Sequence, residues 1–158
     1  MRFLRNFFRK IKYKSKFLSV KKNLNLSYLS HSNTSQELKR LMDYYGSDKG
    51  GKNNHHNYAQ YYSLIFGNQK KNIKNFLEIG LGSNNVKVPS NMGKDGKPLA
   101  SLRAWRDFFI NANIYGADVD KGILKNENRI KTFYVDQTNP DTIKSMFEKI
   151  GVEKFDII

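Results

Sequence analysis

Short apolar runs alternate with amphipathic stretches along most of the chain. The apolar runs are short enough to be buried strands, and they cover residues 76–81, 114–117, 132–135 and 155–158. Apolar side chains recur at helical spacing in the stretches between and before them, at 34–45, 57–65, 100–110 and 140–150. Because strands that alternate with helices favour a parallel sheet with helices on both faces, we predict an α/β fold.

Residue signals mark the ends of two predicted helices. Thr34 opens a capping-box pattern before the first helix, and Gly46 follows its last turn. Asn139, Pro140 and Gly151 supply a cap, a first turn and an end for the last helix. These signals set the predicted bounds of both helices.

The remaining predicted helices carry large apolar side chains. The second helix has a stripe that we predict to pack in the core, formed by Tyr58, Tyr61, Tyr62 and Ile65. The third is predicted to turn Leu102, Trp105 and Phe109 toward the sheet. Arg103 and Arg106 are predicted to lie on a solvated face of that helix, with pairing to an anionic acceptor as the alternative.

The first apolar run ends in Gly80-Leu81-Gly82, which is typical of a strand whose following turn lets a ligand approach the backbone closely. In nucleotide-binding βαβ units an acid follows such a turn by ~20 residues and bonds the ribose hydroxyls. Asp118 follows Gly80 by 38 residues, of which 17 form the polar stretch 83–99. If that stretch is an inserted loop, the remaining 21 residues match the expected spacing.

The residues around the turn indicate which ligand it binds. Glu78 stands two residues before the first glycine, and Asn85 occupies the place of the third glycine of a dinucleotide motif. A carboxylate there would repel a pyrophosphate, but it suits a ligand that carries a sulfonium and an ammonium group. The sequence therefore favours S-adenosylmethionine, and a nicotinamide-dependent Rossmann oxidoreductase is the alternative.

Further motifs follow one another in a fixed order. They are Tyr-Gly-Ser-Asp-Lys-Gly at 45–50, His-Asn-Tyr at 56–58, Leu-Glu-Ile-Gly at 77–80, Ser-Leu-Arg-Ala-Trp-Arg-Asp at 101–107, Ile-Tyr-Gly-Ala-Asp-Val-Asp at 114–120 and Asp-Gln at 136–137. Together, over roughly residues 40–158, the chain resembles a bacterial group of class I methyltransferases that includes O-methyltransferases of macrolide and related glycoside sugars. The resemblance implies the N-terminal half of a Rossmann-like class I methyltransferase fold, S-adenosylmethionine as cofactor, and methylation of a sugar or glycan hydroxyl.

We predict a cofactor site built from Glu78, Gly80, Gly82, Ser101, Asp118, Asp120, Asp136 and Gln137. Asp118 is expected to accept the ribose hydroxyls, with Asp120 as second choice, and the resemblance places Asp136 near the adenine amine. The resemblance also places a loop near the cofactor or the acceptor, with Asp48, Lys49, His56 and Tyr58. It leads us to expect a glycine where Leu99 stands.

Catalytic and metal-binding residues are not found among the 158 residues. Members of the group carry paired aspartates and a histidine, which hold the metal, after a run like 155–158. We therefore expect a fragment or truncated product that is inactive alone, with Mg²⁺ bound only by a full-length relative. Its oligomeric state is left open.

The net charge of +14 is concentrated near the N-terminus. Residues 1–22 hold nine Lys or Arg and no acid, which leaves +5 for the rest. Apolar side chains at helical spacing accompany them at Phe3, Leu4, Phe7, Phe8 and Ile11. A solvated tail, or a helix packed on its own domain, is the favoured reading of this segment.

Two alternatives remain for the basic segment. Contact with an anionic membrane face comes next, and nucleic-acid docking is least favoured because no recognition module is present. A non-catalytic module that docks on a membrane or on nucleic acid through residues 1–22 is a further alternative for the whole chain. We divide the chain into a basic segment with its linker, 1–33, and the methyltransferase domain, 34–158. We expect a cytoplasmic protein, with a peripheral position at the inner face of the membrane as the alternative, and the absence of cysteine is compatible with this setting.

Overall fold

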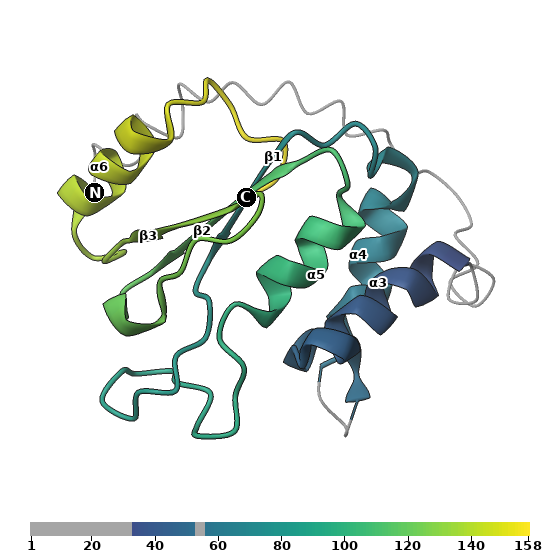
Figure 1. Cartoon of the computed structure of the whole chain (residues 1–158), viewed down its shortest axis with the longest axis horizontal. Coiled ribbons are helices and arrows are strands. Elements are labelled where there is room, and N and C mark those ends of the chain that lie inside the picture. Colours follow the sequence, from purple (N-terminus) through teal and green to yellow (C-terminus); the bar gives the residue numbers. More distant parts are fainter. Residues whose placement is uncertain (1–32, 53–55) are drawn as a thin grey trace.

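The computed structural model describes residues 33–52 and 56–158 (Figure 1). The basic segment 1–22, on which the membrane and nucleic-acid predictions rest, lies outside the described residues. Among the helices that are described, none combines the length and apolar character that a membrane span requires.

Helices and strands alternate as the sequence pattern predicts. The described elements, with η for a short 3₁₀ helix, are α3 (Asn33–Tyr45), η1 (Asp48–Gly50), α4 (Tyr58–Phe66), η3 (Gly67–Gln69), β1 (Asn75–Ile79), α5 (Ala100–Phe108), β2 (Asn113–Asp118), η4 (Lys121–Ile123), β3 (Ile130–Tyr134) and α6 (Pro140–Ile150). Asn139 caps α6 by accepting a hydrogen bond from Asp141 N, and Gly151 ends the helix at φ 68°. Both signals thus act as predicted.

The three strands form a parallel sheet in the order β1-β2-β3. Beyond the outer edge of β1, Ile157 makes a parallel bridge to Phe76, and Leu77 N donates to Ile157 O at 3.0 Å. The predicted fourth strand therefore begins beside β1, although within the described residues it forms only a bridge.

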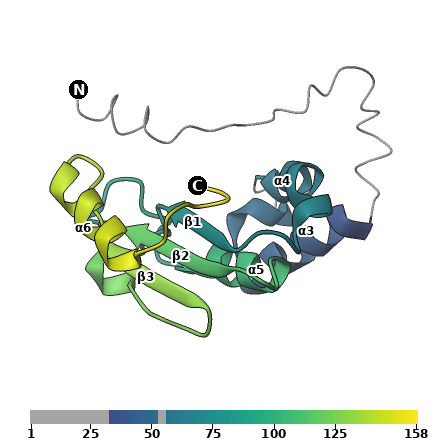
Figure 2. The ribbon, with the colours of Figure 1, turned by 90° about the horizontal axis from the view of Figure 1, so that it is seen from above.

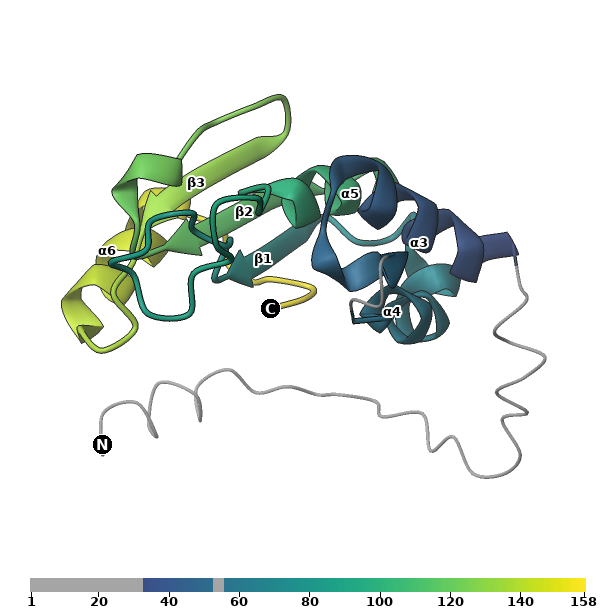
Figure 3. The same cartoon turned by 90° about the horizontal axis from the view of Figure 1, so that it is seen from below.

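Successive side chains of the strands enter two separate cores, because side chains alternate between the faces of a sheet. On one face, Phe76 and Ile114 pack with Trp105 of α5. On the other, Leu77 and Tyr115 pack with residues of α6. Figures 2 and 3 show α6 on one side of the sheet and α5, α3 and α4 on the other. The predicted parallel sheet with helices on both faces is confirmed.

Aromatic rings fill the core between α5 and β1. The Trp105 ring stacks on Phe109 with centroids 5.4 Å apart, and it lies 5.0 Å from the ring of Phe76 and 5.4 Å from that of Tyr62. Trp105, Phe109 and Leu102 are all buried, as predicted for this helix. These contacts join α4, α5 and β1.

The core stripe predicted for α4 is wrong for three of its four side chains. Tyr58, Tyr61 and Ile65 are 45%, 58% and 61% exposed. Ala59 and Ser63 are buried instead, and Ser63 Oγ donates to Ala59 O at 2.7 Å. Apolar side chains cover a wide arc of this helix. The side of the arc that carries the small residues is the one that is buried, which permits close packing on the neighbouring elements.

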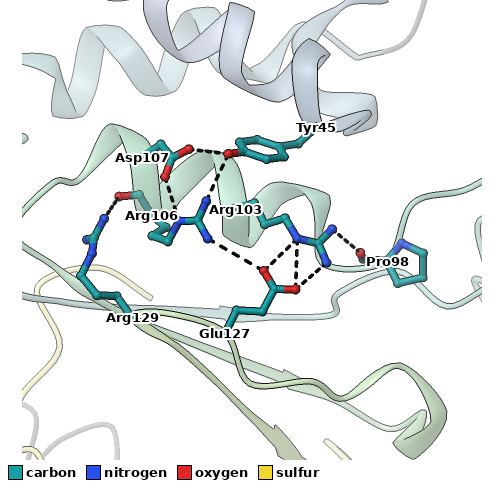
Figure 4. A network of polar contacts seen from close by, with 7 residues as sticks. All are labelled: Tyr45, Pro98, Arg103, Arg106, Asp107, Glu127 and Arg129. Atoms are coloured by element: carbon teal, nitrogen blue, oxygen red, sulfur yellow. Dashed lines mark hydrogen bonds and ion pairs between the residues drawn. The ribbon is translucent and has the colours of Figure 1, made fainter.

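The prediction of a solvated face for Arg103 and Arg106 is also wrong. Both belong to a polar network that joins α5 to α3 and to the segment before β3 (Figure 4). Arg103 Nη2 donates to Glu127 Oε1 at 2.7 Å, and Arg106 Nε donates to Asp107 Oδ1 at 2.8 Å. Tyr45 Oη donates to Asp107 as well. Helical spacing alone does not reveal these partners, because Glu127 and Tyr45 lie on other elements.

The aromatic core is tested by comparing two neighbouring residues. Phe109→Ala removes a fully buried ring, and we expect it to lower the free energy of unfolding by about 3–5 kcal/mol. Ile110→Ala, at a position that is 54% exposed, should change it by less than about 0.5 kcal/mol. Urea denaturation followed by circular dichroism measures both. Equal losses for the two variants would contradict the packing of α5.

Candidate functional site

A pocket of about 540 Å³ opens where the C-terminal ends of the three strands meet. This is the edge at which open parallel sheets bind their ligands, because the loops after the strands converge there. The pocket is lined by the turn after β1, by Asp118 at the end of β2 and Val119 after it, and by residues 135–138 after β3. Residues 47–49 and the loop between β1 and α5 complete it.

The turn after β1 has the backbone conformation that the glycines predict. Gly80 has φ 90° and Gly82 has φ 79°, a region that side chains disfavour. A Cβ on Gly82 would lie 2.4 Å from the Met92 side chain, so the inserted loop packs directly on the turn. Nothing lies within 4 Å of the corresponding position on Gly80, which leaves this part of the turn accessible to a ligand.

Glu78, the penultimate residue of β1, is the most unusual polar group near the pocket. Its side chain is 14% exposed, and Lys49 Nζ lies 3.5 Å from its Oε1. Its Oε2 is buried and has no hydrogen-bond partner among the described residues. Burial raises the pKa of Glu78, and the Lys49 ammonium and the polar hydrogens of Ser101 and Trp105 offset this only in part. A buried acceptor of this kind calls for a donor that the described chain does not supply.

Lys49 is held over Glu78 by the loop that follows α3. Lys52 N donates to Asp43 Oδ1 at 3.2 Å, and Gly50 lies so close to Asp43 that a Cβ would come within 2.1 Å of the same oxygen. Burial alone would lower the pKa of Lys49, but the carboxylates of Glu78 and Asp48 raise it above its ordinary value. Lys49 therefore places a positive charge at the pocket.

Asp118 is placed at the pocket and also braces the turn. It is buried, its Oδ2 accepts from Leu81 N at 2.7 Å, and its Oδ1 accepts from Asp120 N at 2.9 Å. Asp120 accepts from Gly122 N at 2.9 Å and from Ser83 Oγ, and it is not among the residues that line the pocket. Because each carboxylate oxygen can accept twice, Asp118 keeps acceptor capacity for a ligand.

The end of β3 contributes the opposite wall. Asp136, Gln137 and Thr138 line the pocket, together with the buried Val135. Asp136 Oδ1 accepts from Thr138 Oγ1 at 2.6 Å and from Thr138 N at 2.8 Å, and these bonds lower the pKa of Asp136. This wall thus combines an apolar side chain with a carboxylate held in one orientation.

The inserted loop forms a wall of the pocket, which the sequence did not predict. Val88, Pro89, Ser90 and Met92 line it. The Asn84 side-chain amide holds the loop together by donating to the carbonyls of Gly93, Lys94 and Gly96 at 2.8, 3.1 and 3.0 Å. The only sequence signal of this arrangement is the loop's many asparagines and glycines, which form local turns.

Leu99 precedes α5 with φ 63°, a left-handed conformation that favours glycine. This agrees with the expectation of a glycine at the position. Leu99 is nevertheless buried in the core, so its side chain offsets some backbone strain by packing. Ser101, two residues on, is buried and lines the pocket.

The predicted site residues do not all meet at this pocket. Those that line it are Asp48, Lys49, Gly80, Gly82, Ser101, Asp118, Asp136 and Gln137. Glu78 does not line the pocket, but Lys49 and Ser101, which do, both interact with its carboxylate. His56 and Tyr58 lie outside the pocket. Tyr58, the first residue of α4, is exposed to solvent, and its ring stacks on that of His56 with centroids 4.8 Å apart.

Known proteins with methyltransferase activity resemble this chain. No protein-family model matches it. It is 29% identical over 107 residues to the 8-demethyl-8-alpha-L-rhamnosyl tetracenomycin-C 2'-O-methyltransferase of Streptomyces olivaceus, a match that covers 68% of this chain and 25% of that protein. The chain thus spans about a quarter of the length of this curated relative.

Solved structures of methyltransferases also resemble this chain. The MycE methyltransferase of the mycinamycin biosynthetic pathway, in complex with Mg and SAH, superposes with a TM-score of 0.55 at 29% identity, over 72% of this chain and 28% of that one. A second MycE complex, with Mg, SAH and mycinamycin VI, gives 0.54 at 27% identity over the same shares. The predicted Rossmann-like methyltransferase fold and the resemblance to sugar O-methyltransferases are confirmed.

The raised pKa of Glu78 has a consequence for stability. Between the ordinary and the raised pKa the folded chain binds more protons than the unfolded chain, so the stability lost to the buried charge grows as pH rises through that window. Glu78→Gln cannot ionise, and its unfolding free energy relative to wild type should therefore rise as the pH increases above the ordinary pKa of a glutamate.

Urea denaturation at a series of pH values measures this difference. Glu148→Gln, which removes an exposed carboxylate from α6, is the control and should show no such trend. A Glu78→Gln variant whose stability follows that of wild type at every pH would show that Glu78 is not strained by burial.

Proposed function

We propose that this chain binds S-adenosylmethionine and is the cofactor-binding part of an O-methyltransferase whose acceptor is a sugar hydroxyl. The observation that carries the proposal is the buried, unpartnered Oε2 of Glu78 beside a glycine turn at the pocket. The sequence similarity to the rhamnosyl 2'-O-methyltransferase and the fold shared with the SAH-bound MycE structures support it.

The amino group of the cofactor fits the acceptor that Glu78 offers. A buried acceptor left without a hydrogen bond costs about 1–3 kcal/mol, and an ammonium group supplies both hydrogen and charge. The same carboxylate would repel the pyrophosphate of a dinucleotide. The charge at this position therefore selects for the sulfonium ligand and against the nicotinamide alternative.

The other end of the cofactor is assigned to the ends of β2 and β3. Asp118 would accept the ribose hydroxyls with its remaining lone pairs, and Asp120 would support the brace beneath it. Asp136 would accept from the adenine amine, with Gln137 beside it and Val119 and Val135 against the ring. Ser101 and the backbone of Gly80 and Gly82 would lie along the middle of the ligand.

The cofactor and the protein have separate roles in methyl transfer. The bound cofactor supplies a methyl group on a sulfonium, which is a good leaving group. The residues of this chain fix the cofactor's position, so that the acceptor oxygen is held in line with the methyl group. A sugar hydroxyl must also lose its proton to a base or a metal-bound group. The proposal assigns neither role to a residue of this chain.

The acceptor class and the metal are inferred from the relatives alone. One relative methylates a rhamnosyl group, and another binds mycinamycin VI with magnesium. Among residues 33–52 and 56–158, no group of three or more His, Cys, Asp or Glu side chains could hold a metal ion. We therefore propose a glycoside as the acceptor and name no metal ligand.

Calorimetric titration of the chain with S-adenosylhomocysteine and with NAD tests the cofactor proposal. We expect binding of the first in the micromolar range and none of the second. Asp136→Ala should weaken S-adenosylhomocysteine binding up to about tenfold, because it removes one hydrogen bond. Asp141→Ala, a carboxylate five residues on that does not line the pocket, should leave the affinity unchanged.

Circular dichroism of the same sample shows whether the chain is folded. A folded chain that binds NAD in place of S-adenosylhomocysteine would establish the oxidoreductase alternative. A folded chain that binds neither ligand would contradict the assignment of a cofactor site to this pocket.

A further inference from the structure

We infer that Lys49 and Glu78 form a clamp for a zwitterionic α-amino acid group, in which Lys49 binds the carboxylate and Glu78 the ammonium. The inference rests on the proposed function and deepens it, because it names the group that recognises the cofactor's carboxylate. It predicts that the site distinguishes S-adenosyl ligands with a carboxylate from those without one.

The arrangement of the two charges carries the inference. Lys49 Nζ lies 3.5 Å from Glu78 Oε1, and their side chains are 25% and 14% exposed. Lys49 lines the pocket, whereas Glu78 keeps a second, unpartnered oxygen. The two charges of an α-amino acid are separated by a single carbon atom. Such a group can therefore lie across the pair with each of its charges against an opposite one.

Charge balance explains why a zwitterion is the matching ligand. Burial weakens screening by water and salt, so an unmatched charge near this pair is costly. An α-amino acid group adds one charge of each sign, so it leaves the net charge of the site, to which Lys49, Glu78 and Asp48 contribute, unchanged. A ligand with the ammonium alone adds a net positive charge beside Lys49, which is itself held charged by Glu78 and Asp48.

The loop after α3 holds the backbone of Lys49 in place at the pocket before a ligand binds. Ser47 caps η1 by accepting from Lys49 N at 3.4 Å, and Asp43 of α3 fixes Gly50 and Lys52 on the other side. The backbone of Lys49 is thus set by neighbours outside the pocket. On binding, its flexible side chain turns from Glu78 to the ligand's carboxylate, which uncovers Glu78 for the ammonium.

A second Lys–Glu pair provides a matched control. Lys70 pairs with Glu37 away from the pocket, and its side chain is 23% exposed, close to the value for Lys49. Glu37 is 41% exposed. Lys70→Met therefore removes a similarly exposed lysine from an ion pair that does not line the pocket.

The test compares two ligands in one assay, S-adenosylhomocysteine and its decarboxylated analogue. Calorimetry on the full chain gives the two dissociation constants, and their ratio is insensitive to a partly unfolded sample because both constants scale alike. We expect Lys49→Met to reduce the preference for the carboxylate-bearing ligand by about ten- to a hundredfold, since it removes a charge-assisted hydrogen bond. Lys49→Arg should keep most of the preference, and Lys70→Met all of it.

The outcomes separate this inference from the proposed function. If wild type binds S-adenosylhomocysteine but Lys49→Met leaves the ratio unchanged, the clamp is wrong and the cofactor site stands. If Lys49→Met binds both ligands more tightly, Lys49 merely competes with the ammonium for Glu78, and the clamp is again wrong. A folded wild type that binds neither ligand would overturn the proposed function itself.

Discussion

The hydrogen bond that Leu81 N donates to Asp118 Oδ2, at 2.7 Å, joins the ends of β1 and β2 where the pocket opens. It links the glycine turn to the neighbouring strand, and Gly80 N adds a second link by donating to Ala117 O at 2.8 Å. Both hydrogen bonds lie in the turn that contains the left-handed Gly80 and Gly82. The backbone of the turn that lines the pocket is thereby joined to the end of β2.

Charge is distributed unevenly around the braced turn. Glu78 places a buried carboxylate below it, and Lys49 balances that charge from a loop more than two dozen residues earlier in the chain. Because the loop is fixed by Asp43 of α3, the helical layer and the sheet both contribute to the same pocket.

Much of the fold follows from local sequence patterns, because strand runs, caps and terminal glycines act over a few residues. The glycine turn and the acid after β2 belong to this class, and both appear where they were predicted. The inward side of α4 and the partners of Arg103 and Arg106 depend on other elements, and no local pattern contains that information. The same reason explains why the brace by Asp118 and the pocket wall made by the inserted loop were missed.

A crystal structure of the chain with S-adenosylhomocysteine would test the central claim most directly. We expect the ligand's ammonium within hydrogen-bonding distance of Glu78 Oε2, with its ribose at Asp118 and its adenine at Asp136. A ligand that binds with its amino acid end directed away from Glu78, while Lys49 stays paired with that carboxylate, would contradict the proposal that the buried charge at the end of β1 selects the cofactor.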